Sequence, residues 1–387
     1  MKNPADLVDA YTEWCKKECF TEDVVRATAI LNRYCDLCLM GVVRELDLAA
    51  KASSPTSAGD LAKALGFVDT AEITMRYALH RLAARTDAVT VDSDERFTVP
   101  STPADPTEEL ASLRTELKGL GEDYLAAVDF LDFGREHFVK ALRDEPDFMD
   151  KMLAGTTGDW AELWHRATNV DPLQDLHGEM GARAISDVLE QGTILEIGGG
   201  TGNGIRHLFA MMKREGTFDR LERFIFTDIS MRFVLTTKHE INDNYPDVAT
   251  SWKFCDIYKP LQEQKIDEQS VDLIYAVNAA HVAKDIVGFL KSCHWALKPG
   301  GMVLFAERVR FTENDMAPRE LTLNLSKYHR TAAEDQPYRS MHTYLKPREW
   351  EECLRLAGFE PVVLPDLEAM GEYFPDQYAA VVTGRKI

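Results

Sequence analysis

The stretch LEIGGGTGNG, from Leu195 to Gly204, decides how the rest of this sequence of 387 residues is interpreted. It follows a short apolar run and precedes a segment of helical periodicity, so its glycines lie where a strand turns into a helix and a ligand can approach the backbone closely. A dinucleotide-binding turn has the pattern G-x-G-x-x-G, but Asn203 occupies the place of its third glycine. The turn therefore predicts a ligand other than a dinucleotide.

Glu196 precedes the first glycine by two residues and narrows the choice of ligand. A carboxylate at the end of a strand repels a pyrophosphate, but it attracts a cationic or amino-bearing ligand. S-adenosylmethionine carries a sulfonium and an ammonium group and has no phosphate. The pattern E-x-G-x-G-x-G thus favours S-adenosylmethionine as the cofactor.

Apolar runs and helical segments alternate after residue 190. The expected strands cover residues 194–197, 223–227, 271–277, 302–306, 359–363 and 378–382, and the expected helices cover residues 204–214, 231–240, 286–296 and 350–356. Such alternation predicts a parallel sheet with helices on both faces.

The first 150 residues have mostly helical periodicity instead. The expected helices there cover residues 24–48, 58–65 (capped by Ser57), 70–84 and 108–142. A further helical stretch is expected over residues 160–189, before the first strand of the sheet. Two short alternating runs, 88–91 and 96–99, flank a turn and predict a hairpin. The order helix, helix, hairpin is that of a winged helix.

The charge of the chain argues against DNA binding by this winged helix. The formal net charge is −20, from 44 basic and 64 acidic residues, and residues 60–100 contain five basic and seven acidic side chains. An acidic surface repels nucleic acid and anionic lipid. We therefore expect no nucleic-acid or membrane partner, and we interpret the module as one for homodimerisation or for covering the second domain.

The seven cysteines, an odd number, come without a secretory signal or an apolar run long enough to span a membrane. This pattern indicates reduced thiols and a cytoplasmic protein. The pairs Cys15-x3-Cys19 and Cys35-x2-Cys38 could be written as a four-thiolate zinc site. Their helical periodicity, without turn residues, favours small buried apolar side chains instead.

In their order along the chain, the motifs of residues 190–310 resemble those of class I S-adenosylmethionine-dependent methyltransferases. The resemblance rests on the glycine turn and on the segments FTDIS (226–230), FCDI (254–257) and ALKPGG (296–301). It implies that Asp228 accepts hydrogen bonds from the ribose hydroxyls and that Asp256 accepts one from the adenine amine. The implied cofactor-binding residues are Glu196, Gly198, Gly199, Gly200, Gly202, Asp228, Ile229, Asp256, Ile257 and Asn278.

Two subfamilies share the resemblance: winged-helix small-molecule O-methyltransferases and the C-methylating domains of polyketide synthases. In both, His281 falls at the position of the catalytic histidine, and Glu307 at that of an acid ending the fifth strand. Val282-Ala283 departs from the acid–aromatic pair of the O-methyltransferases, whereas TDIS (227–230) and NAAH (278–281) resemble the C-methylating domains. The acceptor atom, oxygen or an activated carbon, stays open.

The expected positions and chemistry of His281 and Glu307 also suit a catalytic base and its partner acid. Ligands of open parallel sheets bind at the carboxyl ends of strands, where His281 and Glu307 can meet. A phenol or a carbon between two carbonyls must lose a proton before it is methylated, and a histidine suits that step near neutral pH. Glu307 would fix the tautomer of His281, as in other pairs of a base and its orienting acid.

Further side chains are candidates for contact with the methyl acceptor. They are Trp160, Trp164, His177, Met180, His329 and His342. For the first four, plain packing in a domain-interface core is the more common role. Together with His281, the last two histidines could ligate a metal, but no short ligand spacing supports this, and we expect no metal.

We therefore predict an α/β protein with a Rossmann-like seven-stranded methyltransferase sheet and a mainly α-helical, winged-helix N-terminal domain. Residues 1–155 are the expected dimerisation and lid domain, and residues 156–387 the expected S-adenosylmethionine-binding catalytic domain. The predicted acceptor is a small molecule of natural-product type, aromatic, polyketide-like or a keto acid. The alternatives are a metabolite-sensing winged-helix regulator and a methyltransferase-like scaffold without turnover.

Overall fold

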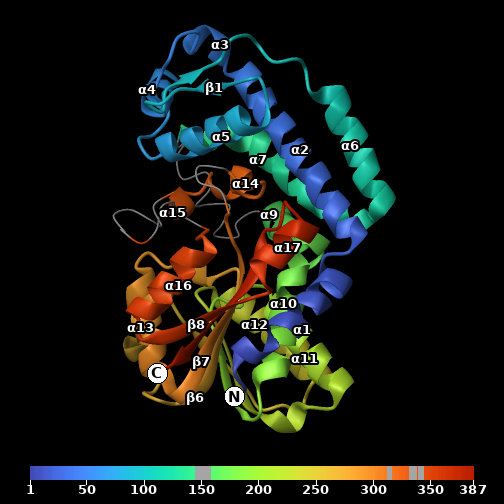
Figure 1. The fold of residues 1–387 in the computed structure, drawn as a ribbon, viewed down its shortest axis with the longest axis vertical. Coiled ribbons are helices and arrows are strands. Elements are labelled where there is room, and N and C mark those ends of the chain that lie inside the picture. Colours follow the sequence, from blue (N-terminus) through green and yellow to red (C-terminus); the bar gives the residue numbers. More distant parts are fainter. Residues whose placement is uncertain (144–157, 312–315, 331–337, 339–343) are drawn as a thin grey trace. The chain divides into compact units, whose positions relative to one another are not determined.

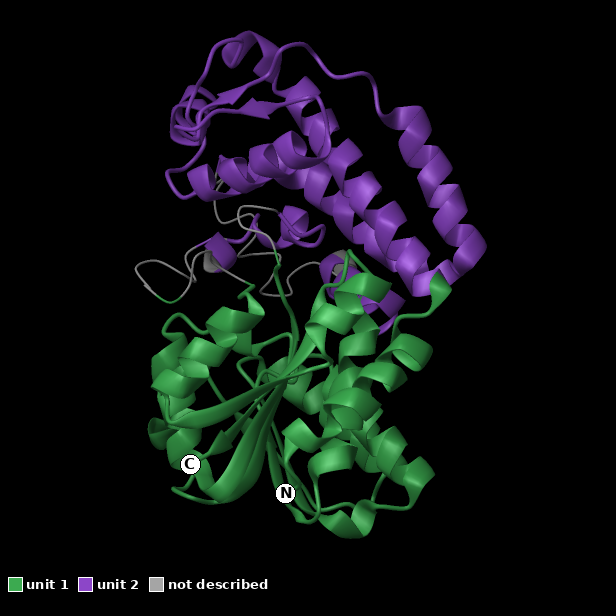
Figure 2. Cartoon of the chain, in the orientation of Figure 1, with its two compact units in different colours: residues 1–22, 174–311, 333–387 green, residues 23–173, 312–332 purple. Residues whose placement is uncertain are grey.

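The computed structural model describes residues 1–143, 158–311, 316–330, 338 and 344–387. The chain forms two compact units, coloured separately in Figure 2. Unit 1 consists of residues 1–22, 174–311 and 333–387, and unit 2 of residues 23–173 and 312–332.

Unit 1 is built on a seven-stranded sheet with the order β5-β4-β3-β6-β7-β9-β8 (Figure 1). Its strands are β3 (Gly192–Glu196), β4 (Leu221–Asp228), β5 (Thr250–Phe254), β6 (Val271–Val277), β7 (Leu297–Arg308), β8 (Phe359–Leu364) and β9 (Ala379–Lys386). The first five are mutually parallel, which confirms the predicted Rossmann-like sheet. The predicted parallel arrangement does not extend to β9, which runs antiparallel to both β7 and β8.

Helices cover both faces of this sheet. They are α1 (Val8–Trp14), α10 (Pro172–Val188), α11 (Asn203–Glu215), α12 (Met231–Asn244), α13 (Ile286–Ala296), α16 (Pro347–Leu356) and α17 (Leu367–Tyr373), with short helical turns at η1 (Pro4–Leu7), η2 (Cys15–Cys19), η4 (Phe218–Arg220), η5 (Leu261–Glu263) and η6 (Ala280–Val282). Figure 1 shows α13 and α16 on one side of the strands and α10 and α11 on the other.

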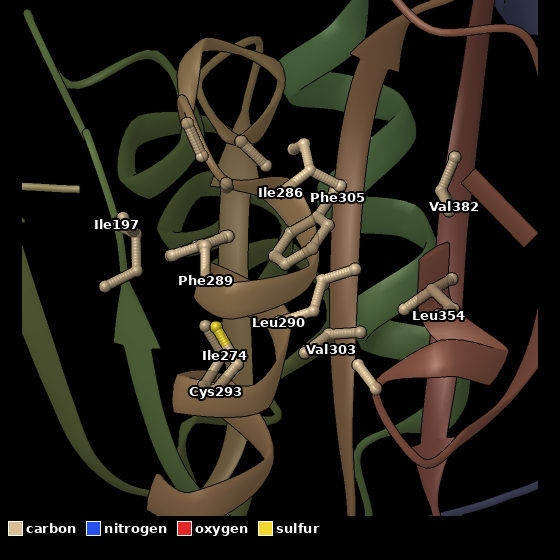
Figure 3. Packing of buried hydrophobic residues seen from close by; sticks show 14 of the residues in the cluster. Ile197, Ile274, Ile286, Phe289, Leu290, Cys293, Val303, Phe305, Leu354 and Val382 are labelled. Atoms are coloured by element: carbon tan, nitrogen blue, oxygen red, sulfur yellow. The ribbon is translucent and has the colours of Figure 1, made fainter. Parts of the chain in front are cut away.

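A continuous apolar core lies between the sheet and α13 with α16. Phe289 and Leu290 of α13 pack against Val303 and Phe305 of β7 (Figure 3). Trp350 of α16 belongs to the same cluster, with its ring centre 6.0 Å from that of Phe305. Burial of each such side chain contributes ~1.5–3 kcal/mol. This core keeps the ends of β6 and β7 in register, where the predicted catalytic residues His281 and Glu307 lie.

Unit 2 is mainly helical. Its elements are α2 (Glu22–Glu45), α3 (Leu48–Lys51), α4 (Ala58–Ala64), α5 (Ala71–Arg85), β1 (Thr90–Val91), β2 (Phe97–Thr98), α6 (Thr107–Leu120), η3 (Glu122–Tyr124), α7 (Leu125–Leu142), α9 (Gly158–Asn169), α14 (Glu320–Leu323) and α15 (Lys327–Arg330). The Ser57 side chain accepts a hydrogen bond from the Asp60 amide at 3.1 Å, so the predicted cap of α4 is present. The helix expected over 108–142 is interrupted after α6 by Gly121 and η3. Dimerisation through this unit remains a prediction.

The compact units do not divide at residue 155. In unit 1, the Tyr11 hydroxyl donates to the Met180 carbonyl at 2.6 Å, and the Asp366 amide donates to the Thr12 hydroxyl at 2.8 Å. In unit 2, the Arg81 guanidinium donates to the Met316 carbonyl at 2.6 Å. Contacts between residues far apart in sequence thus place residues 1–22 in unit 1 and residues 312–332 in unit 2. The functional roles predicted for residues 1–155 and 156–387 stay predictions.

The candidate zinc cysteines lie on helices. Cys15 and Cys19 are buried in η2, and Cys35 and Cys38 are buried in α2. No group of histidine, cysteine and acidic side chains is arranged for a metal ion within the described part of the chain. Over the same residues, no helix has the length and apolar character that a membrane span needs.

Candidate active site

The glycine turn joins β3 to α11 and is tied to the end of β4. Gly198, Gly200 and Gly202 have φ of 63°, 53° and 88°, the left-handed region that glycine adopts at low cost. The Gly199 amide donates to the Thr227 carbonyl at 2.9 Å. The turn is therefore a rigid cradle at the carboxyl end of the sheet.

Gly204 closes this cradle and was not among the predicted site residues. A Cβ atom at this position would collide with Oε1 of Glu196 and with the ring of Tyr275. Only glycine lets the first turn of α11 approach the Glu196 carboxyl so closely. The signal in the sequence was the fourth glycine of the series, spaced two residues from Gly202.

Glu196 is the unusual polar group of the cradle. It is 0% exposed, and neither carboxyl oxygen has a hydrogen-bond partner among the residues that the structure describes. Burial, and secondarily the nearby charge of Asp228, raise the pKa of Glu196 from 4.5 to about 8, while Arg206 opposes the shift. Because an unpaired buried carboxyl is costly, this position fits a ligand that brings its own cation. The ammonium group of S-adenosylmethionine is such a cation.

Asp228, at the end of β4, is held in place by two backbone amides. Its Oδ1 accepts from Ser230 at 2.7 Å, and its Oδ2 accepts from Gly200 at 2.9 Å. Burial raises the pKa of Asp228, and these two hydrogen bonds partly offset the shift. Each carboxylate oxygen keeps further acceptor capacity, which suits a pair of ribose hydroxyls.

The predicted adenine-contacting residues follow β4 and β5. Ile229 is 54% exposed and Ile257 is half-buried, so both present apolar surface at this end of the sheet. The Asp256 side chain accepts from the Tyr258 amide at 3.0 Å and lies 3.4 Å from the Lys259 ammonium. Apolar surface beside a carboxylate acceptor is compatible with a nucleoside.

Asn278 directly follows β6 in a strained left-handed conformation, with φ of 47°. Its Oδ1 accepts from the Arg308 amide at 2.7 Å, which ties the end of β6 to the end of β7. Its Nδ2 is buried without a hydrogen-bond partner among the described residues. Strain and an unused donor at one residue are typical of a ligand-binding position.

The structure brings His281 and Glu307 together, as the topology predicts. His281 lies in η6 after β6, and its Nδ1 is 2.5 Å from Oε2 of Glu307 on β7. The other carboxyl oxygen, Oε1, accepts from the Ala279 and Ala280 amides at 3.1 and 2.8 Å. Both side chains are buried, and three hydrogen bonds fix the carboxylate that orients the imidazole.

The predicted acceptor-contacting residues are distributed over both units. In unit 1, His177 and Met180 are fully buried on α10, and the His177 ring lies 5.8 Å from that of Tyr378. In unit 2, Trp160 and Trp164 of α9 form an aromatic cluster with Phe130. His329 also belongs to unit 2, on α15, and His342 lies outside the described residues. Acceptor contact by these residues stays a prediction.

Comparisons with known proteins agree with this geometry. Residues 195–303 match the family described as methyltransferase domain. A polyketide synthase-like protein of Preussia isomera is 32% identical over 178 residues, 45% of this chain and 8% of that protein. A 6-hydroxymellein synthase of Talaromyces verruculosus is 26% identical over 275 residues, 67% of this chain and 10% of that protein. The chain thus spans about a tenth or less of the curated relatives' length.

Solved structures show the same fold. The CurJ carbon methyltransferase superposes with a TM-score of 0.77 at 18% identity, covering 98% of this chain and 97% of the other. The CMeT domain of the citrinin polyketide synthase gives a TM-score of 0.72 at 15% identity, covering 98% and 94%. The family match identifies residues 195–303 as a methyltransferase domain, and the fold and the glycine turn support the class I S-adenosylmethionine-dependent type. Its cofactor is S-adenosylmethionine.

Proposed function

We propose that this protein methylates an activated carbon, one flanked by two carbonyl groups, in a polyketide-like small molecule. The observation that carries the proposal is the buried His281–Glu307 pair at the ends of β6 and β7, beside the cofactor cradle of β3 and β4. The names of the structural neighbours, two carbon methyltransferases and a polyketide synthase CMeT domain, support carbon over oxygen.

Binding of the cofactor would fall to residues of the cradle. S-adenosylmethionine, when bound, supplies an electrophilic methyl group on a sulfonium. Glu196 would meet its ammonium group, and Asp228 its ribose hydroxyls. The positive φ of the turn glycines lets the backbone follow the ligand closely. Alignment of donor and acceptor alone can lower the barrier by ~7–11 kcal/mol.

His281 would remove the proton from the acceptor carbon. Because Nδ1 donates to the Glu307 carboxylate, the basic lone pair of the neutral ring is on Nε2. As Nε2 takes the proton, the ring becomes an imidazolium, and the adjacent carboxylate stabilises that charge. The two backbone amides on Oε1 keep Glu307 from turning away.

The test is methylation of matched acceptors by the purified chain. With S-adenosylmethionine, we expect the N-acetylcysteamine thioester of acetoacetate to gain one methyl group, and a simple phenol to gain none. His281→Ala should lower turnover by ~10²–10⁴ while S-adenosylhomocysteine still binds. Methylation of the phenol alone, or full turnover by His281→Ala, would contradict the proposal.

A further inference from the structure

Arg308 is the last residue of β7 and directly follows Glu307. Its side chain is buried, with 5% of its surface exposed. Among the residues that the structure describes, no carboxylate pairs with its guanidinium, and its buried Nε has no hydrogen-bond partner. The proposed mechanism does not yet use this cation.

Two tyrosine rings hold the guanidinium. Its central carbon lies 4.2 Å from the ring centre of Tyr378 and 6.0 Å from that of Tyr344. The Tyr344 ring also packs against the His281 ring, with centres 4.8 Å apart. The arginine and the proposed base therefore contact the same aromatic side chain. The Arg308 amide also donates to the side-chain Oδ1 of Asn278, which holds the end of β7 in place.

Two other buried arginines of this protein lie beside carboxylates. Arg81 of unit 2 is 1% exposed, and its Nε donates to Asp36 at 2.6 Å. Arg319 of unit 2 is 5% exposed, and its Nη1 donates to a carbonyl at 2.8 Å and lies 3.4 Å from Asp171. A buried charge without an opposite charge is costly, and stacking on aromatic rings offsets only part of that cost. The missing anion is thus expected to arrive with the substrate.

We propose that Arg308 binds the two carbonyl oxygens of a 1,3-dicarbonyl acceptor and stabilises the enolate formed when His281 removes the proton between them. This inference rests on the proposed function. The carbon–hydrogen bond breaks, the proton goes to Nε2 of His281, and the electron pair is shared between the two oxygens. The planar guanidinium presents paired N–H donors, which match two parallel oxygens as they match a carboxylate.

The test measures proton removal without methyl transfer. The chain is loaded with S-adenosylhomocysteine, and deuterium exchange at the central carbon of the acetoacetyl thioester is followed in D2O by NMR, after subtraction of the buffer rate. Arg308→Gln should lower the enzyme-dependent exchange rate and the methylation turnover by ~10²-fold, as removal of an oxyanion donor does. Arg308→Lys, which keeps the charge but not the fork, should lose ~10-fold.

A matched control and a folding check complete the experiment. Arg355, on α16, is exposed and pairs with Glu351 at 2.8 Å, so Arg355→Gln should exchange and methylate like the wild type. Calorimetry with S-adenosylhomocysteine shows which variants are folded. If Arg308→Gln does not fold, the exchange rate of Arg308→Lys provides the test. Normal exchange by a folded Arg308 variant would overturn the inference and leave carbon methylation standing. No exchange and no carbon methylation by the wild type would overturn the proposed function itself.

Discussion

Two buried glutamates at the same end of the sheet have opposite surroundings. Glu196 ends β3 and has no hydrogen-bond partner among the described residues, whereas Glu307 on β7 accepts two backbone amides and contacts the His281 imidazole. Both are 0% exposed. We interpret the unpaired carboxyl as the place of a ligand, and the fully paired one as part of the proposed catalytic pair.

The largest effect is expected at the paired glutamate. In Glu307→Gln the amide can donate to Nδ1 of His281 and so favour the wrong tautomer. Turnover should fall by up to ~10⁴, as it does when a triad acid becomes an amide. Affinity for S-adenosylhomocysteine, measured by calorimetry, should not change. A loss of affinity equal to the loss of turnover would show that Glu307 contributes to cofactor binding instead of orienting His281.

Asp228 is expected to be the next most sensitive position, because it is proposed to bind the ribose of the cofactor. Asp228→Ala removes acceptors for the ribose and should weaken S-adenosylhomocysteine binding ~10–100-fold. Deuterium exchange at saturating S-adenosylhomocysteine should stay near the wild-type rate. Asp228→Asn is the matched control, since it keeps the size of the side chain and one acceptor oxygen. Unchanged affinity in Asp228→Ala would reject its role.

The Glu196 pKa of about 8 predicts how cofactor affinity changes with pH. Below that pH, Glu196 is protonated in the free protein and must release its proton to pair with a cation. Affinity for S-adenosylhomocysteine should therefore rise ~5-fold from pH 7 to pH 8. Glu196→Gln cannot ionise, so it should bind more weakly and lose this part of the pH dependence, which titration calorimetry can measure.

The same shift has a consequence for the stability of the ligand-free protein. Between the ordinary pKa of 4.5 and about 8, native Glu196 keeps a proton that the unfolded chain has released. The contribution of Glu196 to the free energy of unfolding therefore falls as pH rises through this window. Melting curves of Glu196→Gln should be less sensitive to pH there. The stability of Glu196→Gln relative to the wild type should therefore increase as pH rises. An increase of this relative stability toward acid pH would contradict the raised pKa of Glu196.

The smallest effect is expected from Gly204→Ala. Its Cβ would press on Glu196 and Tyr275, so we expect a loss of ~1–3 kcal/mol in the free energy of unfolding and weaker cofactor binding. Gly371, on α17, has open space where a Cβ would lie, and Gly371→Ala is the control. Denaturation and calorimetry of the two variants would show whether the close approach at Gly204 matters.

Much of this site could be predicted because parallel topology gathers strand ends. The glycine turn, Asp228 and the His281–Glu307 contact all follow from strands recognised by their apolar runs. Strand β5 was missed because its TSWKF segment is an edge strand with polar residues on a partly exposed surface. The division into units could not be predicted, since it depends on long-range contacts such as that of Arg81 with Met316.

The role of Arg308 could not be predicted for a related reason. An arginine after a strand is ordinary in a sequence, and only the structure shows it buried between two tyrosines without an acid. The unpaired state of Glu196 is likewise a property of packing. Sequence patterns thus identify which residues reach the site, but not which of them are left for a ligand.

The position of the transferred methyl group distinguishes carbon methylation from oxygen methylation. The wild-type chain is incubated with S-adenosylmethionine labelled with carbon-13 in its methyl group and with the acetoacetyl thioester, and the product is analysed by NMR. Carbon methylation predicts a labelled methyl group coupled to the carbon between the two carbonyls. A labelled methoxy group on an enol ether would contradict it.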